Sequence, residues 1–557
     1  MKTKEKLWHV HYPEEIPTSI EYDEQPLHGF LQASAKNYGK MKALHFMGKE
    51  TTFEELHQEA KQIAHFLQEK GLEKGDRVAI MLPNCPQAVI SYYGILLAGG
   101  VVVQTNPLYT ERELAYQLED SGATFIVCLD ILLPRVQKVR GTSKLKHTIV
   151  TKIKEYLPFP KNLIYPFIQK RQYNMSVKVQ EDKETHAWPT ILKTYDGSYT
   201  EVPVDPKTDV ALLQYTGGTT GSPKGVMLSH YNLVANTQMC QHWIYKSEVN
   251  KEVILGVLPL FHVYGMTTVM NLSVMMANKI ILLPKFDAGE VLKTIDKEKP
   301  TIFPGAPTIY VGLIHHPDLK QYDLSSVESC ISGSASLPLE VSDQFERETD
   351  GSLVEGYGLT ETSPVTHANF LWDKRIHGSI GVPWPDTDSK IVDMETREEM
   401  PIGEVGEVAV KGPQVMLGYW QNKEETEKVL EDGWMYTGDL GYMDEEGFFY
   451  IVDRKSDMII AGGFNIYPRE VEEVLYEHEG IQEVTVAGVP DDYRGETVKA
   501  FIVLKQGVTL TEKELDTFCR DRLAAFKVPR KYDFRKELPK SAIGKVLRRK
   551  LVDESDE

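Results

Sequence analysis

Short apolar runs alternate regularly with helical segments early in the chain, and this alternation constrains the fold more than any other feature. Strands are predicted at residues 78–82, 100–103 and 124–128, and helices at residues 86–98 and 111–121. A similar alternation returns between residues 253 and 354. The pattern is typical of β-α-β units, in which helices cover both faces of a mostly parallel sheet.

The chain is too long for one hydrophobic core, and its character changes after Asp453. With 557 residues, more than one domain is expected. Strands are predicted at residues 484–489 and 498–504, followed by a helix at residues 511–525. We therefore expect an α/β protein with a large N-terminal domain of mostly parallel sheets flanked by helices (residues 1–453) and a small, mobile α+β C-terminal domain (residues 454–557).

The charge balance and the placement of cysteine exclude several function classes. The formal net charge of −19 argues against a general nucleic-acid binder, which needs a basic surface to displace counterions from phosphates. The five cysteines are scattered without a Cys-x-x-Cys spacing, so neither a zinc site nor a disulfide framework is expected. The N-terminus lacks the apolar core of a secretory signal, and no uncharged run approaches the length of a membrane span. We therefore expect a cytoplasmic protein.

Residues 152–171 depart from this plan, because aromatic and aliphatic side chains are mixed there with lysine and arginine. Two interpretations stay open. In the first, which Pro158, Pro160 and Pro166 favour, the segment is a surface loop that packs its aromatic side chains on the body of the protein. In the second, it lies in a lipid interface, as basic, aromatic-rich stretches can, and the protein is peripheral at the inner face of the membrane.

A glycine- and threonine-rich segment, residues 215–225 (YTGGTTGSPKG), follows an apolar strand predicted at residues 210–214. Glycine lets backbone N–H groups approach a phosphate closely, threonine hydroxyls add donors, and lysine adds a positive charge. A Walker loop is excluded, because its lysine precedes Ser or Thr at the start of a helix, whereas Lys224 stands between Pro223 and Gly225. The predicted phosphate ligands are Thr216, Gly217, Gly218, Thr219, Thr220, Gly221 and Lys224.

At this loop the sequence resembles the adenylate-forming superfamily, which includes acyl- and aryl-CoA ligases, peptide-synthetase adenylation domains and beetle luciferases. The resemblance continues over nearly the whole chain in the superfamily's order, at residues 258–262 (LPLFH), 333–335 (GSA), 356–362 (GYGLTET), 436–439 (YTGD) with 453–454 (DR), 462–465 (GGFN) and 539–545 (PKSAIGK). Details such as Gly217-Gly218 and residues 453–455 (DRK) resemble the bacterial long-chain fatty acid–CoA ligases.

This resemblance implies an ATP site and assigns roles to individual residues. The adenine would lie against residues Gly333, Ser334, Ala335, Gly356, Tyr357 and Gly358. Asp439 would accept hydrogen bonds from the ribose hydroxyls, and Arg454 would donate to the same sugar.

The resemblance also implies which residues act on the reacting groups. A fatty carboxylate is ionised at pH 7 and needs no general base, so catalysis would be electrostatic and positional. Thr360 would hydrogen-bond the α-phosphate, and Glu361 would hold Mg²⁺ against the phosphates. Lys545 would bridge the incoming carboxylate and the α-phosphate. His262 would line the acyl or α-phosphate pocket.

A second half-reaction would need a different arrangement of the two domains. In the superfamily, the small domain rotates so that a thiol can reach the acyl-AMP carbonyl. Ser456 would be the pivot, at a position where relatives usually carry Lys or Asp. Gly462 and Gly463 would approach the pantetheine arm of coenzyme A, because residues without a Cβ permit close backbone approach.

The expected activity is ATP-dependent ligation of a long-chain fatty acid to coenzyme A through acyl-AMP. A medium-chain or aryl acid–CoA ligase is an alternative, because no spacing encodes chain length. A luciferase-like monooxygenase, a non-catalytic acyl-nucleotide sensor and an adenylation module serving a carrier protein are alternatives of other classes. Lys224, Glu361, Asp439 and Lys545 together argue against a sensor, and no carrier domain follows Lys550. Whether the protein forms a homodimer stays open.

Overall fold

The computed structural model describes residues 6–173, 177–216, 223–461, 464–491, 494–541 and 544–554. Its largest sheet has eight strands in the order β18-β9-β8-β4-β3-β5-β6-β7. The six strands from β8 to β7 are parallel, and β9 and β18 are antiparallel additions at one edge. The strands are β3 (Arg77–Met81), β4 (Val101–Gln104), β5 (Phe125–Leu129), β6 (His147–Thr151), β7 (Thr185–Ala187), β8 (Val210–Thr216), β9 (Lys224–Ser229) and β18 (Gly418–Tyr419).

Both helices predicted at residues 86–98 and 111–121 form, and local chemistry explains their ends. Helix α3 (Pro86–Leu97) begins with Pro86, whose fixed φ suits a first helical position. Helix α4 (Glu111–Ser121) has a capping box between Thr110 and Glu113 and ends at Gly122, which adopts φ 62°. Every residue of α3 is buried, because the helix lies between the large sheet and helix α2 (Phe53–Glu69).

Two further sheets share one edge, and a third lies beside them. The first contains β10 (Val253–Gly256), β11 (Lys279–Leu282), β1 (Lys42–Phe46) and β2 (Lys49–Thr52). The second contains β12 (Ser329–Ser332), β13 (Ser352–Gly358), β14 (Val365–Ala368) and β15 (Val382–Pro383), and Ile302 bridges it to β10. The third contains β16 (Asp388–Val392), β17 (Gly406–Lys411), β19 (Leu430–Glu431), β20 (Trp434–Met443) and β21 (Phe449–Arg454).

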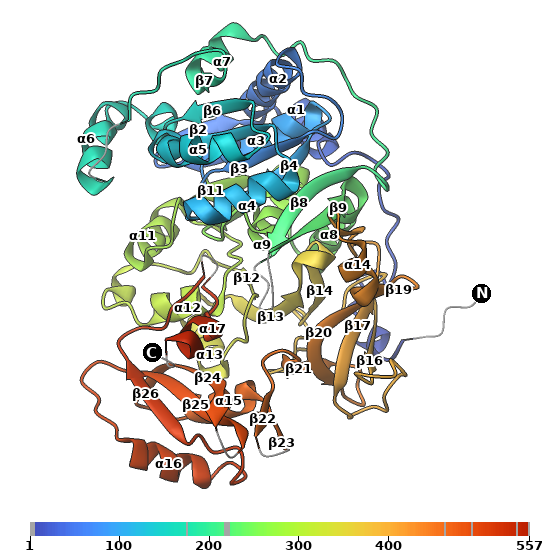
Figure 1. Cartoon of the computed structure of the whole chain (residues 1–557), viewed down its shortest axis with the longest axis vertical. Helices are drawn as coiled ribbons and strands as arrows, with labels where there is room; N and C mark the ends of the chain where they lie inside the picture. The colour runs from blue at the N-terminus through green and yellow to red at the C-terminus, as the bar shows by residue number, and fades with distance from the viewer. Residues whose placement is uncertain are drawn as a thin grey trace.

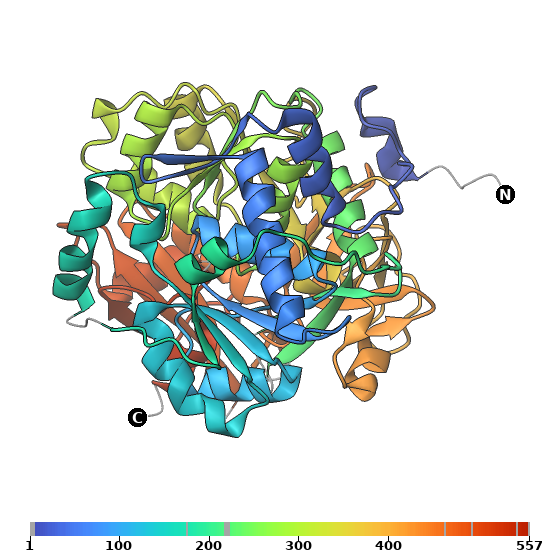
Figure 2. The same cartoon turned by 90° about the horizontal axis from the view of Figure 1, so that it is seen from above.

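Helices cover these sheets from both sides (Figures 1 and 2). Besides α2, α3 and α4, those of the larger part are α1 (Gly29–Tyr38), α5 (Leu133–Val139), α6 (Lys161–Tyr173), α7 (Trp188–Thr194), α8 (His230–Trp243), α9 (Val263–Gly265), α10 (Leu272–Met275), α11 (Ala288–Glu298), α12 (Pro307–Ile314), α13 (Leu339–Thr349) and α14 (Lys423–Val429). Among the helices within the described ranges, none is both long and apolar enough to cross a bilayer.

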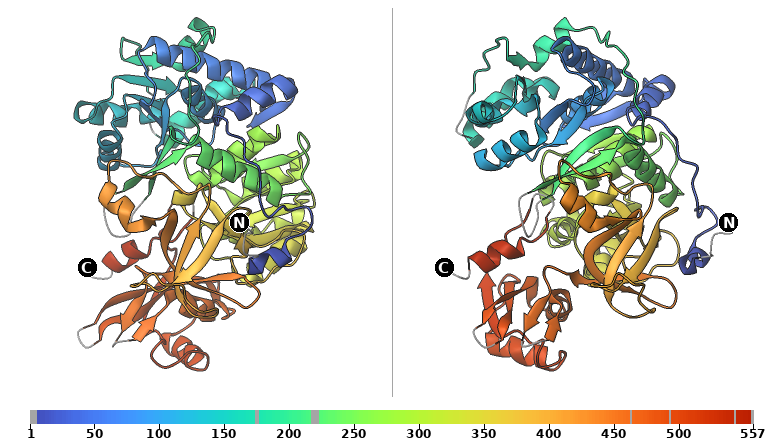
Figure 3. Two further views of the ribbon diagram at one scale, coloured as in Figure 1. Left: turned by 90° about the vertical axis from the view of Figure 1, so that its right-hand side faces the viewer. Right: turned by 45° about the vertical axis from the view of Figure 1, so that its right-hand side comes forward.

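The C-terminal part forms a smaller α+β unit with its own core. Its sheet contains β22 (Ile459–Ala461), β23 (Phe464–Ile466), β24 (Ile481–Asp491), β25 (Gly495–Leu504) and β26 (Lys531–Arg535), and its helices are α15 (Pro468–Tyr476), α16 (Glu512–Arg520) and α17 (Arg548–Asp553). Helix α16 ends five residues before the predicted end at residue 525. Figures 1 and 3 show this unit at one end of the molecule, with α17 on the side that faces the larger part.

The predicted surface loop at residues 152–171 is wrong, because most of its second half is helix α6. Leu157 is buried, as that interpretation expects, but Phe159 and Phe167 are 79% and 76% exposed. Helix α6 stands at the periphery in Figures 1 and 2. Phe159 and Phe167 therefore point away from the body rather than packing on it.

Candidate active site

A cleft of about 2270 Å³ lies between the larger part and the C-terminal unit. The predicted residues that line it are Thr216, Lys224, His262, Gly333, Ser334, Ala335, Gly356, Tyr357, Gly358, Thr360, Glu361, Asp439, Arg454, Ser456 and Lys545. The remaining predicted residues, Gly217, Gly218, Thr219, Thr220, Gly221, Gly462 and Gly463, lie outside the described residues. The fold thus brings together segments that are more than 300 residues apart in the chain.

Asp439 is the centre of a polar group on one wall of the cleft. It lies on β20 directly opposite Arg454 on β21, so the antiparallel register sets the two side chains next to each other. Arg454 Nε is 3.3 Å from Asp439 Oδ1, and Tyr357 OH donates a 2.7 Å hydrogen bond to Oδ2. Burial raises the pKa of Tyr357 well above its ordinary value, so this hydroxyl stays a donor. Arg454 and Tyr357 therefore hold the carboxylate in place at this wall of the cleft.

Glu361 lies in a short 3₁₀ helix, Thr360–Thr362, that follows β13. Tyr419 OH on β18 donates a 2.9 Å hydrogen bond to Glu361 Oε1. Burial raises the pKa of this carboxyl group, and the Tyr419 hydrogen bond opposes that shift only in part. A carboxylate whose charge is poorly compensated by the protein favours a nearby cation.

Lys224 opens β9 and forms an ion pair with Glu425 on α14. Its ammonium group also lies 5.0 Å from the centre of the Tyr419 ring. The hydrogen bond from Lys224 lowers the pKa of Glu425 to about 2. Tyr419 therefore connects Lys224 with Glu361, an arrangement that residues almost 200 positions apart can reach only by tertiary folding.

Lys545 enters the cleft from the C-terminal unit on a tight turn. Ser541 N donates a 2.7 Å hydrogen bond to Lys545 O, and Gly544 has φ +80°. A Cβ added to Gly544 would lie 3.3 Å from the Cβ of Thr308 and closer still to its Oγ1. Since Thr308 belongs to α12 of the larger part, the turn is docked directly on that part.

Lys545 is buried among charged side chains of both signs, Arg454 and Arg548 on one hand and Asp439 and Asp457 on the other. Burial, followed by the nearby Arg454 charge, lowers the pKa of Lys545 to about 8. Burial and the Lys545 charge likewise lower the pKa of His262 to about 4. His262 Nδ1 accepts a 3.3 Å hydrogen bond from Tyr264 N at the start of α9, so the neutral ring is held in place. Of Lys545 and His262, only Lys545 is therefore charged near pH 7.

The predicted adenine-contacting turn follows β12. Ser334 adopts φ +75°, which is uncommon for a residue other than glycine. A Cβ on Gly333 would lie 3.1 Å from the Tyr264 ring, whose hydroxyl donates a 2.6 Å hydrogen bond to Ile331 O. The small residue thus lets the turn lie flat on an aromatic ring.

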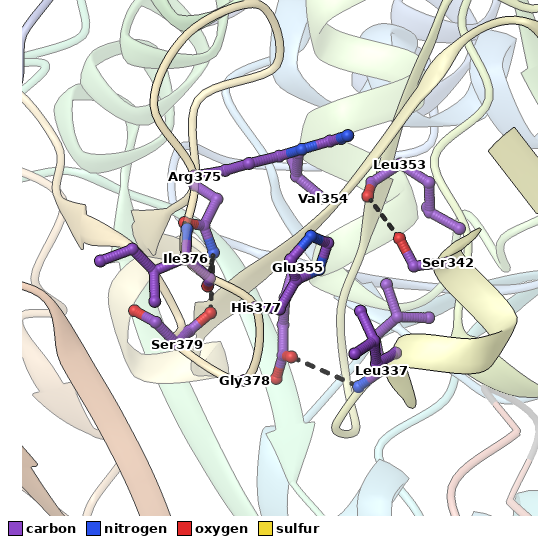
Figure 4. A pocket seen from close by; sticks show the side chains of 12 residues that line it. Leu337, Ser342, Leu353, Val354, Glu355, Arg375, Ile376, His377, Gly378 and Ser379 are labelled. Carbon is purple, nitrogen blue, oxygen red and sulfur yellow. Dashed lines mark hydrogen bonds between the residues drawn. The ribbon is translucent and has the colours of Figure 1, made fainter.

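A second, much smaller cavity of about 20 Å³ adjoins this region (Figure 4). Its lining includes the charged residues Glu355 and Arg375, and Glu355 accepts a 3.4 Å hydrogen bond from Leu337 N. Burial raises the pKa of Glu355 to about 7, opposed by Arg469 of the C-terminal unit at 3.9 Å. The volume is enough for about one water molecule.

Sequence reasoning missed several residues that shape the site, namely Thr308, Glu355, Tyr419, Glu425 and Arg469. Glu355 carried a usable signal, because it directly precedes the motif at residues 356–362. The others lie in ordinary sequence surroundings, and only their contacts across the cleft identify them.

Comparisons with known proteins agree with this geometry. The sequence profile of the AMP-binding enzyme family matches residues 31–420, and that of the AMP-binding enzyme C-terminal domain matches residues 470–545. The chain is 57% identical to a long-chain-fatty-acid–CoA ligase of Bacillus subtilis over 99% of both chains. It is 40% identical to a long-chain-fatty-acid–CoA ligase of Escherichia coli over 99% of this chain and 98% of that protein.

Two solved structures have a similar architecture. ATP-bound MatB from Rhodopseudomonas palustris superposes with a TM-score of 0.83 at 28% identity, covering 96% of this chain and 99% of that one. The anthranilate CoA ligase AuaEII in complex with anthranoyl-AMP gives a TM-score of 0.84 at 28% identity, covering 97% and 98%. From the profile match over residues 31–420 and the relatives matched over nearly their full length, we conclude that this chain belongs to the AMP-binding enzyme family.

Proposed function

We propose that the protein is a long-chain fatty acid–CoA ligase, which couples a fatty acid to coenzyme A and converts ATP to AMP and pyrophosphate. The observation that carries this proposal is the docking of Lys545 in the same cleft as the Asp439, Tyr357 and Arg454 group. Asp439 would accept hydrogen bonds from the ribose hydroxyls of a bound nucleotide. Lys545 would place a positive charge near its α-phosphate, where a second anion, the carboxylate, must attack. The names of the full-length relatives support the choice of a long-chain acid.

In the first half-reaction, the carboxylate oxygen attacks the α-phosphorus and pyrophosphate leaves. Asp439 and Arg454 would hold the ribose, while Gly333–Ala335 and Gly356–Gly358 frame the adenine. Thr360 would donate to the α-phosphate. Lys545 would lie between the two anions, and with a pKa of about 8 it is mostly protonated at pH 7. An ammonium group in a water-poor site opposes the repulsion of two anions far better than it could in water.

The triphosphate would be received at the end of β8. Thr216 ends this strand, and Lys224 begins the next, so both flank the phosphate loop. The Lys224–Glu425 ion pair supports this role, because it holds the ammonium group near the cleft. On binding ATP, Lys224 would exchange the Glu425 carboxylate for a phosphate oxygen.

Glu361 would hold Mg²⁺. Its buried carboxylate, which accepts a hydrogen bond from Tyr419 at Oε1, suits a hard cation. When bound, Mg²⁺ would neutralise charge on the leaving pyrophosphate. Tyr419 would keep the Glu361 carboxylate pointing into the cleft.

For the second half-reaction, the C-terminal unit would rotate about Ser456 so that the thiol of coenzyme A reaches the acyl-AMP. Strand β21 ends at Arg454 and β22 begins at Ile459, and this short connection supports a pivot between them. We place the domain boundary between residues 453 and 454. Gly462 and Gly463 would then line the path of the pantetheine arm.

We also propose that α6 contacts an anionic membrane surface. Residues Asn162, Tyr165 and Gln169 face the body, and Gln169 Nε2 donates hydrogen bonds of 3.1 and 3.2 Å to Asp130. The opposite face exposes Leu163, Ile164, Phe167 and Ile168 next to the exposed Lys170 and Arg171. Surface helices normally bury their apolar face, so this reversed orientation supports insertion into a lipid interface.

The membrane proposal is tested by sedimentation with vesicles of anionic or neutral lipids. Phe159→Ser with Phe167→Ser should abolish sedimentation with anionic vesicles and leave soluble turnover intact. Val10→Ser with Ile402→Ser, two exposed apolar positions elsewhere, is the matched control. If the α6 variant instead turns a dimer into a monomer by light scattering, with vesicle binding unchanged, α6 is a homodimer contact.

The proposed ligase activity is tested by ATP–pyrophosphate exchange with saturated acids of increasing length and with aryl acids, followed by addition of coenzyme A. Long-chain acids should support both exchange and acyl-CoA formation. If only aryl acids or only medium-chain acids support exchange, the protein is a ligase for that class of acid instead. Oxygen-dependent turnover without coenzyme A would favour a luciferase-like monooxygenase, and the absence of exchange with every acid would favour a sensor.

A further inference from the structure

Arg548 is the first residue of α17 and stands three positions after Lys545. Its guanidinium group contacts three carboxylates. Nη1 lies 3.2 Å from Asp453 Oδ1 and 3.1 Å from Asp457 Oδ2, and Nη2 donates bonds of 2.8 and 2.9 Å to the two oxygens of Glu472. One side chain therefore joins the segment that carries Lys545 to the connection between the two parts of the molecule.

These carboxylates lie on opposite sides of Ser456. Asp453 is in β21, which pairs with β20 of the larger part, whereas Asp457 and Glu472 follow Ser456. Arg469 makes a similar connection, since its N–H donates to Asp453 Oδ2 at 2.8 Å and its Nη1 donates to Ile451 O at 2.7 Å. Any large rotation about Ser456 must separate Arg548 from Asp453 but can leave its contacts with Asp457 and Glu472 intact.

The contact between Arg548 and Asp453 is electrostatically strong. Burial alone disfavours the charged guanidinium, but Glu472, Asp453 and Asp457 together raise the pKa of Arg548. Burial raises the pKa of Asp453, and Arg548 is the main opposing charge. Removing one partner of a buried pair leaves the other charge uncompensated.

We propose that Arg548 is a positioning residue that holds Lys545 in the cleft for acyl-adenylate formation and leaves Asp453 when the C-terminal unit rotates. The proposal rests on the ligase function proposed above. Arg548 lines the same cleft and acts through the docked position of the Lys545 turn. Thioester formation, which needs the rotated arrangement, does not use its contact with Asp453.

The test compares Arg548→Gln and Arg548→Lys in each half-reaction. Arg548→Gln should lower ATP–pyrophosphate exchange by about 10- to 100-fold, the range expected for losing a charge-assisted hydrogen bond. Thioester formation from supplied acyl-AMP should stay within about threefold of the unmodified rate, because the rotated arrangement lacks this contact. Arg548→Lys, which keeps the charge, should recover part of the exchange. The control is Arg520→Ala, which removes another arginine–carboxylate pair of the same unit at an exposed helix surface.

Asp453→Asn tests the same proposal from the other partner. It weakens the ion pair between Arg548 and Asp453 and leaves the contacts of Arg548 with Asp457 and Glu472 in place. It should also lower exchange more than thioester formation. Equal losses in both half-reactions, or normal exchange in both variants, would overturn the positioning role while leaving the ligase function in place. If the unmodified protein gives no exchange with any acid, the ligase function fails and this proposal fails with it.

Discussion

Gly544→Ala tests whether docking of the Lys545 turn limits acyl-adenylate formation. The added methyl group would lie 3.3 Å from Thr308 Cβ and in steric conflict with Thr308 Oγ1. At φ +80°, a residue with a Cβ also costs about 1–2 kcal/mol relative to glycine. Overpacking adds roughly 1–3 kcal/mol. The docked arrangement should therefore lose about 2–5 kcal/mol, or roughly 30- to 5000-fold in the rate of the first half-reaction.

The assay measures pyrophosphate exchange and, separately, thioester formation from supplied acyl-AMP. The second rate should change little, because the turn leaves Thr308 when the C-terminal unit rotates. Adding Thr308→Ala to Gly544→Ala should restore the part of the loss that comes from the clash, and the part that comes from φ should remain. Normal exchange in Gly544→Ala would refute the reasoning, since it would mean that adenylation does not require the docked turn.

Three further substitutions and one titration probe the same cleft. Lys545→Ala should abolish exchange but spare thioester formation from acyl-AMP; equal losses would exclude its role between the two anions. In the unmodified protein, kcat/KM for adenylation should fall about tenfold per pH unit above pH ~8, because Lys545 loses its proton as the pH rises through its pKa of about 8. Glu361→Gln should weaken the magnesium dependence of exchange without unfolding the protein, and an unchanged magnesium titration would remove Glu361 as a ligand. Ser456→Pro should let acyl-AMP accumulate while acyl-CoA production drops, because proline fixes φ near −65°; normal rates in both steps would move the pivot to a neighbouring residue.

Ser456 forms a hydrogen bond of 3.0 Å from its hydroxyl to Asp457 Oδ1. The residue itself therefore engages the carboxylate that Arg548 also contacts. Ser456→Ala would show whether this local hydrogen bond favours the docked arrangement. A faster second half-reaction with unchanged exchange is the expected result, because the pivot would lose one contact that ties it to Asp457.

Much of the architecture is readable from local pattern. The predicted and observed ends of helix α4 agree. Residues in or next to the helix set both ends, since Thr110 and Glu113 form a capping box and Gly122 is the C-cap. Buried parallel strands such as β3 and β5 are continuous apolar runs, which is how strands covered on both faces read. Helix α6 was missed because it has a proline inside it and an apolar face that is not turned to a core, so periodicity pointed to no buried side.

The sequence by itself indicated the family and the βαβ alternation, and it predicted Asp439, Glu361 and Lys545 as site residues, because motifs and helix caps are formed by residues a few positions apart. Only the tertiary structure decided what surrounds them. Three contacts join segments that are distant in the sequence: Tyr419 with Glu361, Thr308 with the Lys545 turn, and Arg548 with Asp453. Such partners are set by the packing of whole helices and strands. The low pKa of Lys545 has the same origin, since burial between two parts of the molecule is a property of their docking and not of any local sequence.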